Sequence, residues 1–177
     1  ASIFLPFLPM LPIHILIQNL IYDVSQISIP WDKMDEDYLK QPRKWDASGI
    51  SRFMIFIGPI SSIFDIVTFL VMWFVFKCSA GTEAAQALFH SGWFVEGLLS
   101  QTLIVHMIRT KKIPFIQDSA SFPVMILTLL AMIAGIVIPF TSFGRSVDLT
   151  ALPPLYFVWL AGILISYCFL TQVVKKW

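Results

Sequence analysis

The feature that most constrains this chain is a series of apolar runs, each long enough to cross a lipid bilayer. They occupy about residues 11–30, 53–77, 86–108, 121–142 and 152–174. A helix needs about 20 mostly apolar residues to span a hydrocarbon core roughly 30 Å thick. Because 57% of the residues are apolar and only 13% are charged, a water-soluble globular fold is excluded. The sequence predicts an all-α, polytopic membrane helix bundle with five full transmembrane helices.

A shorter apolar stretch, residues 1–9, precedes the first full run. At 1.5 Å per helical residue it covers only about half of the hydrocarbon core. The chain starts at Ala1, and no Lys or Arg precedes Lys33, so the basic region of a signal peptide is missing. We expect residues 1–9 to be the end of a truncated helix.

Lys and Arg residues are distributed unevenly between the segments that join these runs. One set of alternate segments holds ten of them, which are Lys33, Lys40, Arg43, Lys44, Arg52, Arg109, Lys111, Lys112, Lys175 and Lys176. The opposite set holds only Lys77 and Arg145. Short loops rich in Lys and Arg remain in the cytoplasm. The pattern predicts a multi-pass protein with a cytoplasmic C-terminus.

Charge, cysteines and motifs exclude several function classes. A net charge of +1 gives no basic field for nucleic-acid binding. Cys78 and Cys168 stand alone, without the spacing of a zinc site or a disulfide framework. Phosphate-binding loops, zinc-protease motifs, nucleophile elbows and a DKTGT phosphorylation motif are all missing from the sequence. This sequence therefore does not hydrolyse ATP by itself.

Three carboxylates lie inside the apolar runs, where a charge is costly and therefore suggests a function. Asp23 lies four residues after Asn19, so both are on one helical face. Asp65 lies in the middle of the second run, and Glu96 lies in the third. His14 and His106, near the ends of their runs, are expected to lie at the membrane interface.

Carboxylate and amide oxygens are the ligands of hard divalent cations. The residues themselves therefore favour a Mg²⁺ or Ca²⁺ site that includes Asn19, Asp23, Asp65 and Glu96. The alternative is that each acid is protonated or hydrogen-bonded and only holds helices together.

Several stretches of the chain resemble a known family. They include LPIHILIQNLIYDVSQISIPWDKMD, RFMIFIGPISSIFDIVTF, GWFVEGLLSQTLIVHMIRTKKIPF and LTQVVKK. This sequence is similar to the C-terminal membrane region of bacterial magnesium-transporting P-type ATPases. The resemblance covers the whole chain and implies that residues 1–177 are the C-terminal transmembrane domain. Residues 1–9 would end the fifth of ten helices, and the five full runs would be the sixth to tenth.

The resemblance also implies roles for individual residues. Asn19 and Asp23 match the NLxxD pattern of the sixth helix, which supplies cation ligands across P-type ATPases. Tyr22 departs from calcium pumps, which have a small hydroxyl residue there, and this argues against calcium as the cargo. Asp65 resembles a feature of the magnesium branch. For the eighth helix, two alignments of the motif point to Glu96 and to Gln101.

The implied function is to form the membrane transport domain of an ATP-driven Mg²⁺ transporter in the bacterial inner membrane. The expected partners are Mg²⁺, membrane lipid and the remaining domains of the same ATPase. ATP would act only through those domains, because the family's phosphorylated aspartate lies outside this sequence. Two alternatives remain: a bracing bundle without ion contact, and an intramembrane aspartyl protease using Asp23 and Asp65. Such proteases carry GxGD at the second aspartate, where this chain has SIFD.

Overall fold

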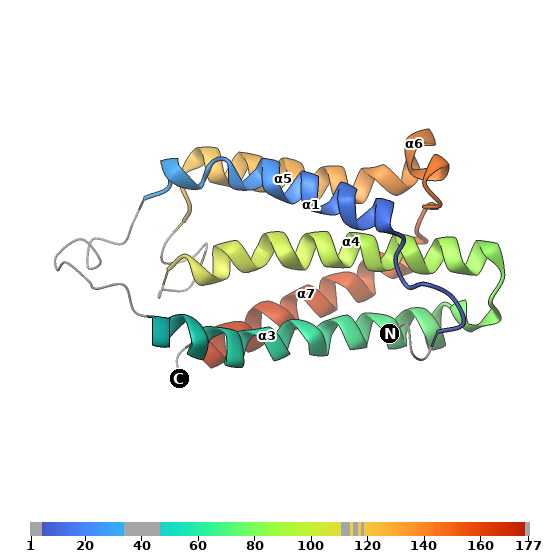
Figure 1. Cartoon of the computed structure of the whole chain (residues 1–177), viewed down its shortest axis with the longest axis horizontal. Helices are drawn as coiled ribbons and strands as arrows, with labels where there is room; N and C mark the ends of the chain where they lie inside the picture. The colour runs from blue at the N-terminus through green and yellow to red at the C-terminus, as the bar shows by residue number, and fades with distance from the viewer. Residues whose placement is uncertain (1–4, 34–46, 111–113, 115–116, 118, 176–177) are drawn as a thin grey trace.

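The computed structural model describes residues 5–33, 47–110, 114, 117 and 119–175, with the backbone alone for residues 47–54 and 80. Within these residues, every regular element is helical and there is no β-strand. Figure 1 shows an elongated bundle in which long helices run side by side. The predicted all-α class is therefore confirmed for the part of the chain that the structure describes.

Long helices joined by short helical turns make up the bundle (Figure 1). The long helices are α1 (Pro12–Gln26), α3 (Ala47–Leu70), α4 (Glu83–Ile108), α5 (Phe122–Val137) and α7 (Pro154–Lys175). The shorter elements are η1 (Ile29–Trp31), the π-helical turn η2 (Val71–Val75), η3 (Cys78–Ala80), η4 (Ile138–Phe140) and α6 (Ser142–Ser146). Each long helix runs opposite to the next, so the connections alternate between the two ends of the bundle.

Proline and threonine residues fix where several helices begin. Pro12 and Pro123 lie in the first turns of α1 and α5, where the missing N–H of proline has no helical partner to lose. Thr82 caps α4, because its hydroxyl accepts a hydrogen bond of 3.3 Å from the amide of Ala85. The starts of these helices therefore follow from local sequence.

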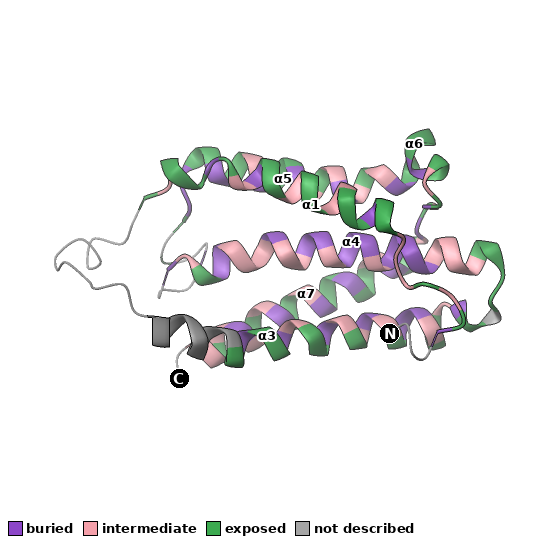
Figure 2. Ribbon diagram, viewed as in Figure 1, coloured by how far each residue is buried: buried purple, intermediate pink, exposed green. Residues whose placement is uncertain are grey.

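Helix α4 is the centre of the bundle. It packs against α1, α3, α5 and α7, while α1 pairs with α5 and α3 pairs with α7. Figure 2 shows most of α4 as buried or intermediate, whereas α5 and α7 carry many exposed positions. The outer helices therefore each present one face to the centre and another to the surroundings.

The main apolar core surrounds the first half of α4. Phe89 and Phe94 of α4 are fully buried and pack in one cluster with Met72 and Tyr156. The Tyr156 hydroxyl donates a hydrogen bond of 2.5 Å to the carbonyl of Gly92. A Cβ atom at Gly92 would lie 2.7 Å from the Met72 sulfur. The missing side chain of Gly92 therefore allows α4, η2 and α7 to pack closely.

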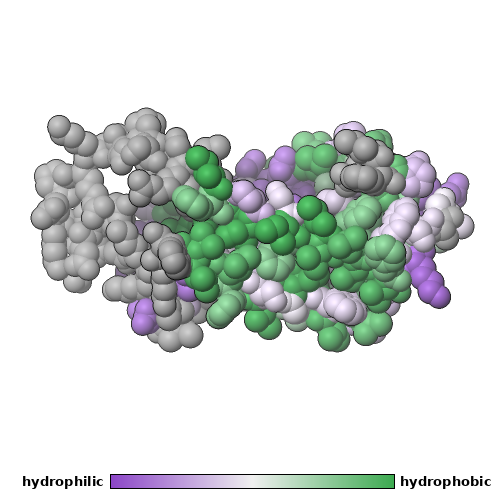
Figure 3. Space-filling model, turned by 90° about the horizontal axis from the view of Figure 1, so that it is seen from below, coloured by the Kyte–Doolittle hydropathy of each residue, from purple (hydrophilic) through white to green (hydrophobic). Residues whose placement is uncertain are grey.

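Three described segments are long and apolar enough to cross a membrane. They are Ile55–Val75, Phe122–Phe140 and Pro154–Lys175. Figure 3 shows one face of the molecule with its described surface largely covered by apolar side chains, as lipid contact requires. Three of the five expected spans thus have the required length and composition. The spans expected over 11–30 and 86–108 stay predictions. The helix in the first, α1, has only 15 residues, and the helix in the second, α4, carries many polar side chains.

The first described residues differ from the expectation of a helix end over residues 1–9. Residues 5–11 have no regular helical structure, and residues 1–4 lie outside the described residues. Pro6, Pro9 and Pro12 follow one another at intervals of three. A proline removes a backbone donor and disfavours helical geometry in the residue before it. These prolines disfavour a regular helix over residues 5–11, and Pro12 itself begins α1.

Candidate functional site

Asn19 and Asp23 lie on one face of α1, as their spacing predicts. Both side chains are exposed, and so are Leu16 and Leu20 beside them. Other faces of α1 pack on α4 and α5. Within the described residues, the amide and the carboxylate therefore point outward from the bundle.

Asp65 of α3 and Glu96 of α4 are brought together by the packing of their helices. The two carboxyl groups interact electrostatically, and Glu96 also lies beside Ser100. Glu96 is only 1% exposed, and neither of its oxygens has a well-formed hydrogen bond to another described residue. A buried carboxylate costs free energy unless a proton, a cation or water compensates it. This pair is therefore suited to hold a proton or a cation.

A partly open cavity of about 330 Å³ lies beside this pair, between α1, α3, α4 and α7. Its polar lining consists of a carboxyl group, two amides and three hydroxyls. These belong to Gln18, Ser61, Asp65, Ser100, Gln101 and Tyr167. The hydroxyls of Ser61 and Tyr167 are 3.1 Å apart and form a hydrogen bond between α3 and α7. Almost all of these groups can offer an oxygen atom to a ligand.

Gln18 is the residue through which α1 reaches the cavity. A Cβ atom at Gly97 of α4 would lie 2.7 Å from the Gln18 amide nitrogen, so the glycine makes room for this side chain. Sequence reasoning missed both Gln18 and Tyr167. Gln18 is next to Asn19, but successive residues of a helix differ by about 100° in direction, which turns it to a different face.

The structure thus divides the four predicted ligands into two groups. Asp65 and Glu96 are together, whereas Asn19 and Asp23 are exposed on another face of α1. Glu96 and Gln101, the two possible ligands from the family's eighth helix, both lie on α4. Gln101 lines the cavity, and Glu96 lies beside Asp65. The carboxyl neighbour of Asp65 is Glu96 rather than the Asp23 that an aspartyl protease would use. The described residues include no group of three or more His, Cys, Asp or Glu placed to hold a metal.

Asp32 joins three segments at the end of the bundle where α1 and α4 finish. Its carboxylate accepts hydrogen bonds from Arg109 Nε at 2.7 Å, from the amide of Ser121 at 2.8 Å and from the amide of Lys33 at 3.0 Å. Burial by itself would raise the pKa of Asp32, but these hydrogen bonds and the Arg109 charge outweigh it and lower the pKa. Ionised Asp32 therefore fixes the segment after α1 to the end of α4 and the start of α5.

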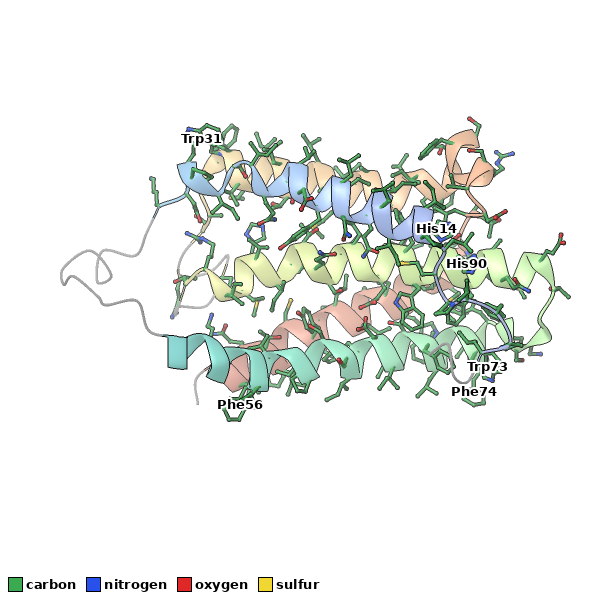
Figure 4. The ribbon with its side chains drawn as sticks, viewed as in Figure 1. His14, Trp31, Phe56, Trp73, Phe74 and His90 are labelled. Carbon is green, nitrogen blue, oxygen red and sulfur yellow. The ribbon has the colours of Figure 1, made fainter. Side chains whose placement is uncertain are left out.

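Two histidines pack together at the opposite end of the bundle. The ring centroids of His14 and His90 are 5.2 Å apart, and Figure 4 shows both far from Trp31. Nε2 of His14 lies 2.5 Å from the carbonyl of Val147, and Nε2 of His90 lies 2.8 Å from the carbonyl of Leu8. Because a carbonyl only accepts, each Nε2 carries the hydrogen. The His14 side chain is completely buried in the protein, and its expected depth at the membrane interface stays a prediction.

Comparison with known proteins identifies the family. The chain is 61% identical over 176 residues to "Magnesium-transporting ATPase, P-type 1" of Salmonella typhimurium, and 59% identical over 175 residues to the protein of that name from Escherichia coli K12. Each alignment covers 99% of this chain but only 19% of the relative. Residues 7–177 match the family described as "Cation transporting ATPase, C-terminus". The chain therefore belongs to the family of cation-transporting ATPase C-terminal regions.

Proposed function

We propose that this chain is the membrane transport region of an ATP-driven magnesium transporter. The names of its relatives support Mg²⁺ as the cargo. The observation that carries the proposal is the position of Asp65, which is at the centre of the candidate span Ile55–Val75 and beside Glu96. Carboxyl groups at membrane depth that meet amides and hydroxyls form a suitable environment for a hard cation.

Asn19 and Asp23 form the part of the transport site that other helices of the full-length protein complete. Their exposure on α1 supports this assignment, because an aspartate on a lipid-facing surface is costly. Asp65 of α3, with Glu96 of α4 beside it, supplies a further oxygen ligand along the path of the ion. ATP hydrolysis belongs to domains outside this sequence, and its energy reaches the ion through movement of α1 relative to those helices.

The region lies in the bacterial inner membrane with five spans and a cytoplasmic C-terminus. The ends of α1, α4 and α7 are at one end of the bundle, close to Lys33, Arg109 and Lys175 (Figure 1). Lys77 and Arg145 lie in the connections at the other end. The bias of basic residues toward one side supports this orientation. A cysteine introduced at position 177 should react with a membrane-impermeant reagent only in inside-out vesicles.

The transport role of Asp23 can be tested in the full-length protein. Asp23→Asn should abolish Mg²⁺ transport into or out of proteoliposomes while leaving expression and membrane insertion unchanged, because the amide carries no charge for the cation. The exposed Asp148, which lies between α6 and α7, provides a matched control. Asp148→Asn should transport Mg²⁺ at the wild-type rate. Wild-type transport by Asp23→Asn would remove Asp23 from the site.

A bracing role for α3, α4, α5 and α7 without ion contact is the second candidate, and the hydrogen bond between Ser61 of α3 and Tyr167 of α7 favours it. Asp65→Asn separates the two candidates. A ligand role predicts a higher Mg²⁺ concentration for half-maximal transport with little change in thermal stability. A bracing role predicts a lower unfolding temperature with unchanged Mg²⁺ dependence. Melting curves and transport measured on one preparation distinguish these results.

A further inference from the structure

The cavity between α1, α3, α4 and α7 opens onto a different face of α1 from the one that carries Asn19 and Asp23. Gln18 lines the cavity, whereas Asn19 and Asp23 are exposed on the outward face of the helix. An ion coordinated directly by Asn19 and Asp23 would therefore lie outside this cavity. The polar lining needs an explanation of its own.

The lining has the chemistry of a cation site. Asp65 supplies a carboxyl group to the cavity wall. Glu96 interacts with Asp65 and is buried, and neither of its oxygens has a well-formed hydrogen bond to a described residue. Gln18 and Gln101 add amide oxygens. The residues that line this described cavity include no Lys or Arg that could neutralise the carboxyl groups. A negative field in a low-dielectric environment attracts a cation and repels anions.

The size of the cavity indicates in which form a cation would enter. A water molecule occupies about 30 Å³, so an ion with six waters needs roughly 180 Å³. The cavity volume of about 330 Å³ accommodates such an ion with space for additional water. Mg²⁺ gives up its water reluctantly and is commonly held through one or two carboxylates with several waters retained. Hydroxyl and amide groups around the wall can accept or donate hydrogen bonds to these waters.

We propose that this cavity is a second cation station, which holds a hydrated Mg²⁺ ion through water between Asp65, Gln18 and Gln101. This station rests on the proposed transport function and deepens it. The ion binds there in its hydrated form and loses its waters only when it reaches Asn19 and Asp23. Glu96 interacts with Asp65 from α4 and positions its carboxyl group.

Trp93 gives this station its own optical reporter, because its indole lines the cavity. In the full-length transporter without nucleotide, MgCl₂ is titrated while tryptophan fluorescence is recorded, with choline chloride keeping the ionic strength constant. The wild type is compared with Trp93→Phe, and the difference between the two curves isolates the Trp93 signal. We expect a saturable change in that signal.

Three variants, each prepared both with Trp93 intact and with the Trp93→Phe substitution, then test the assignment. Asp65→Asn should shift the midpoint of the Trp93 signal to at least about tenfold higher Mg²⁺, because one charge is lost from the site. Asp23→Asn should keep the wild-type midpoint although transport is lost. Asp148→Asn should change neither. An unchanged midpoint in Asp65→Asn, or loss of the Trp93 signal in Asp23→Asn, overturns the second station.

Gln101→Leu keeps the proposal testable if Asp65→Asn does not fold. This substitution leaves both carboxyl groups in place and removes one amide. It should raise the Mg²⁺ concentration at the midpoint by about threefold, which corresponds to the free energy of one hydrogen bond. A wild-type midpoint in Gln101→Leu contradicts the proposal. The proposed function fails on a separate result, which is normal transport by Asp23→Asn, whatever the Trp93 signal does.

The hydration of the bound ion has its own measurement. Mn²⁺ replaces Mg²⁺ in the Asp23→Asn protein, and pulsed electron paramagnetic resonance in ¹⁷O-labelled water counts the waters on the metal. An ion held in the cavity keeps most of its octahedral shell of waters. An ion that has exchanged half or more of them for protein oxygens contradicts the hydrated form.

Discussion

Helices α4 and α5 are neighbours, but their surfaces face opposite kinds of environment. Leu98 of α4 is completely buried, whereas Leu130 of α5 is 54% exposed. Only α5 belongs to a segment apolar enough to qualify as a membrane span, while α4 carries Glu96, His90 and His106 in its buried surface. Of these two neighbours, the apolar α5 faces outward and the more polar α4 is enclosed.

This arrangement follows from the solvent. Lipid accepts apolar side chains at no cost, so α5 needs little burial, whereas each polar group on α4 needs protein around it. Hydropathy therefore identifies the helices that contact lipid, but it undervalues α4, which carries buried polar groups. The following predictions test this contrast, from the largest expected effect to the smallest.

The first prediction compares one substitution at two leucines. Leu98→Ala leaves a cavity in the protein core and should cost about 2–5 kcal/mol of stability. Leu130→Ala exchanges one lipid-exposed apolar surface for a smaller one, so it should cost less than about 1 kcal/mol. Unfolding midpoints of the detergent-purified variants measure the difference. Equal losses would mean that α5 is covered as fully as α4.

The second prediction compares two glycines. Gly92→Val on α4 must displace the Met72 sulfur and the Tyr156 ring, so overpacking should cost about 3 kcal/mol. Gly162 of α7 has no neighbour within 4 Å of an added Cβ, and Gly162→Val should be close to neutral. The two melting temperatures decide this comparison. A stable Gly92→Val protein would show that α4 is loosely packed.

The third prediction concerns the ion pair that fixes the end of α4. Asp32→Asn should cost about 2 kcal/mol near neutral pH, because three hydrogen bonds to a carboxylate are weakened. The lowered pKa means that folded protein binds fewer protons than unfolded protein, so this contribution is complete above the ordinary value of 3.8. It should be lost as the pH falls through the lowered pKa. Unfolding curves of wild type and variant should therefore converge in acid, and a constant difference would refute the assignment.

The smallest effect is expected where α4 and α5 share a polar contact. Nε2 of His106 lies 2.9 Å from the Thr128 hydroxyl, which itself donates to the carbonyl of Val124. Thr128→Val keeps the shape but removes the hydroxyl, at a cost of about 1 kcal/mol. Thr171→Val is the matched control, because the buried Thr171 hydroxyl has no hydrogen-bond partner among the described residues. Its stability should be unchanged or higher.

The sequence predicted the helical class because apolar runs and prolines act locally. It also predicted a role for Asp65 and Glu96, since an acid inside an apolar run stands out, and that role stays a prediction. It grouped them with Asn19 and Asp23, which are exposed on another face of α1, and it did not find Gln18 or Tyr167 in the cavity. Those assignments depend on how α1 and α7 rotate against α4, and that rotation is set by close contacts such as the one at Gly97. Residues distant in sequence determine such contacts, so a single helix pattern does not reveal them.

The central position of Asp65 in Ile55–Val75 has an electrical consequence. A divalent ion held beside it lies about halfway through the membrane, so two charges moving over half the field equal one charge crossing all of it. That movement is worth about 2.3 kcal/mol for every 100 mV of membrane potential. Occupancy of the cavity should therefore change with voltage by roughly fiftyfold per 100 mV. For the proposed second cation station, the bilayer potential would thus regulate how often the station is filled.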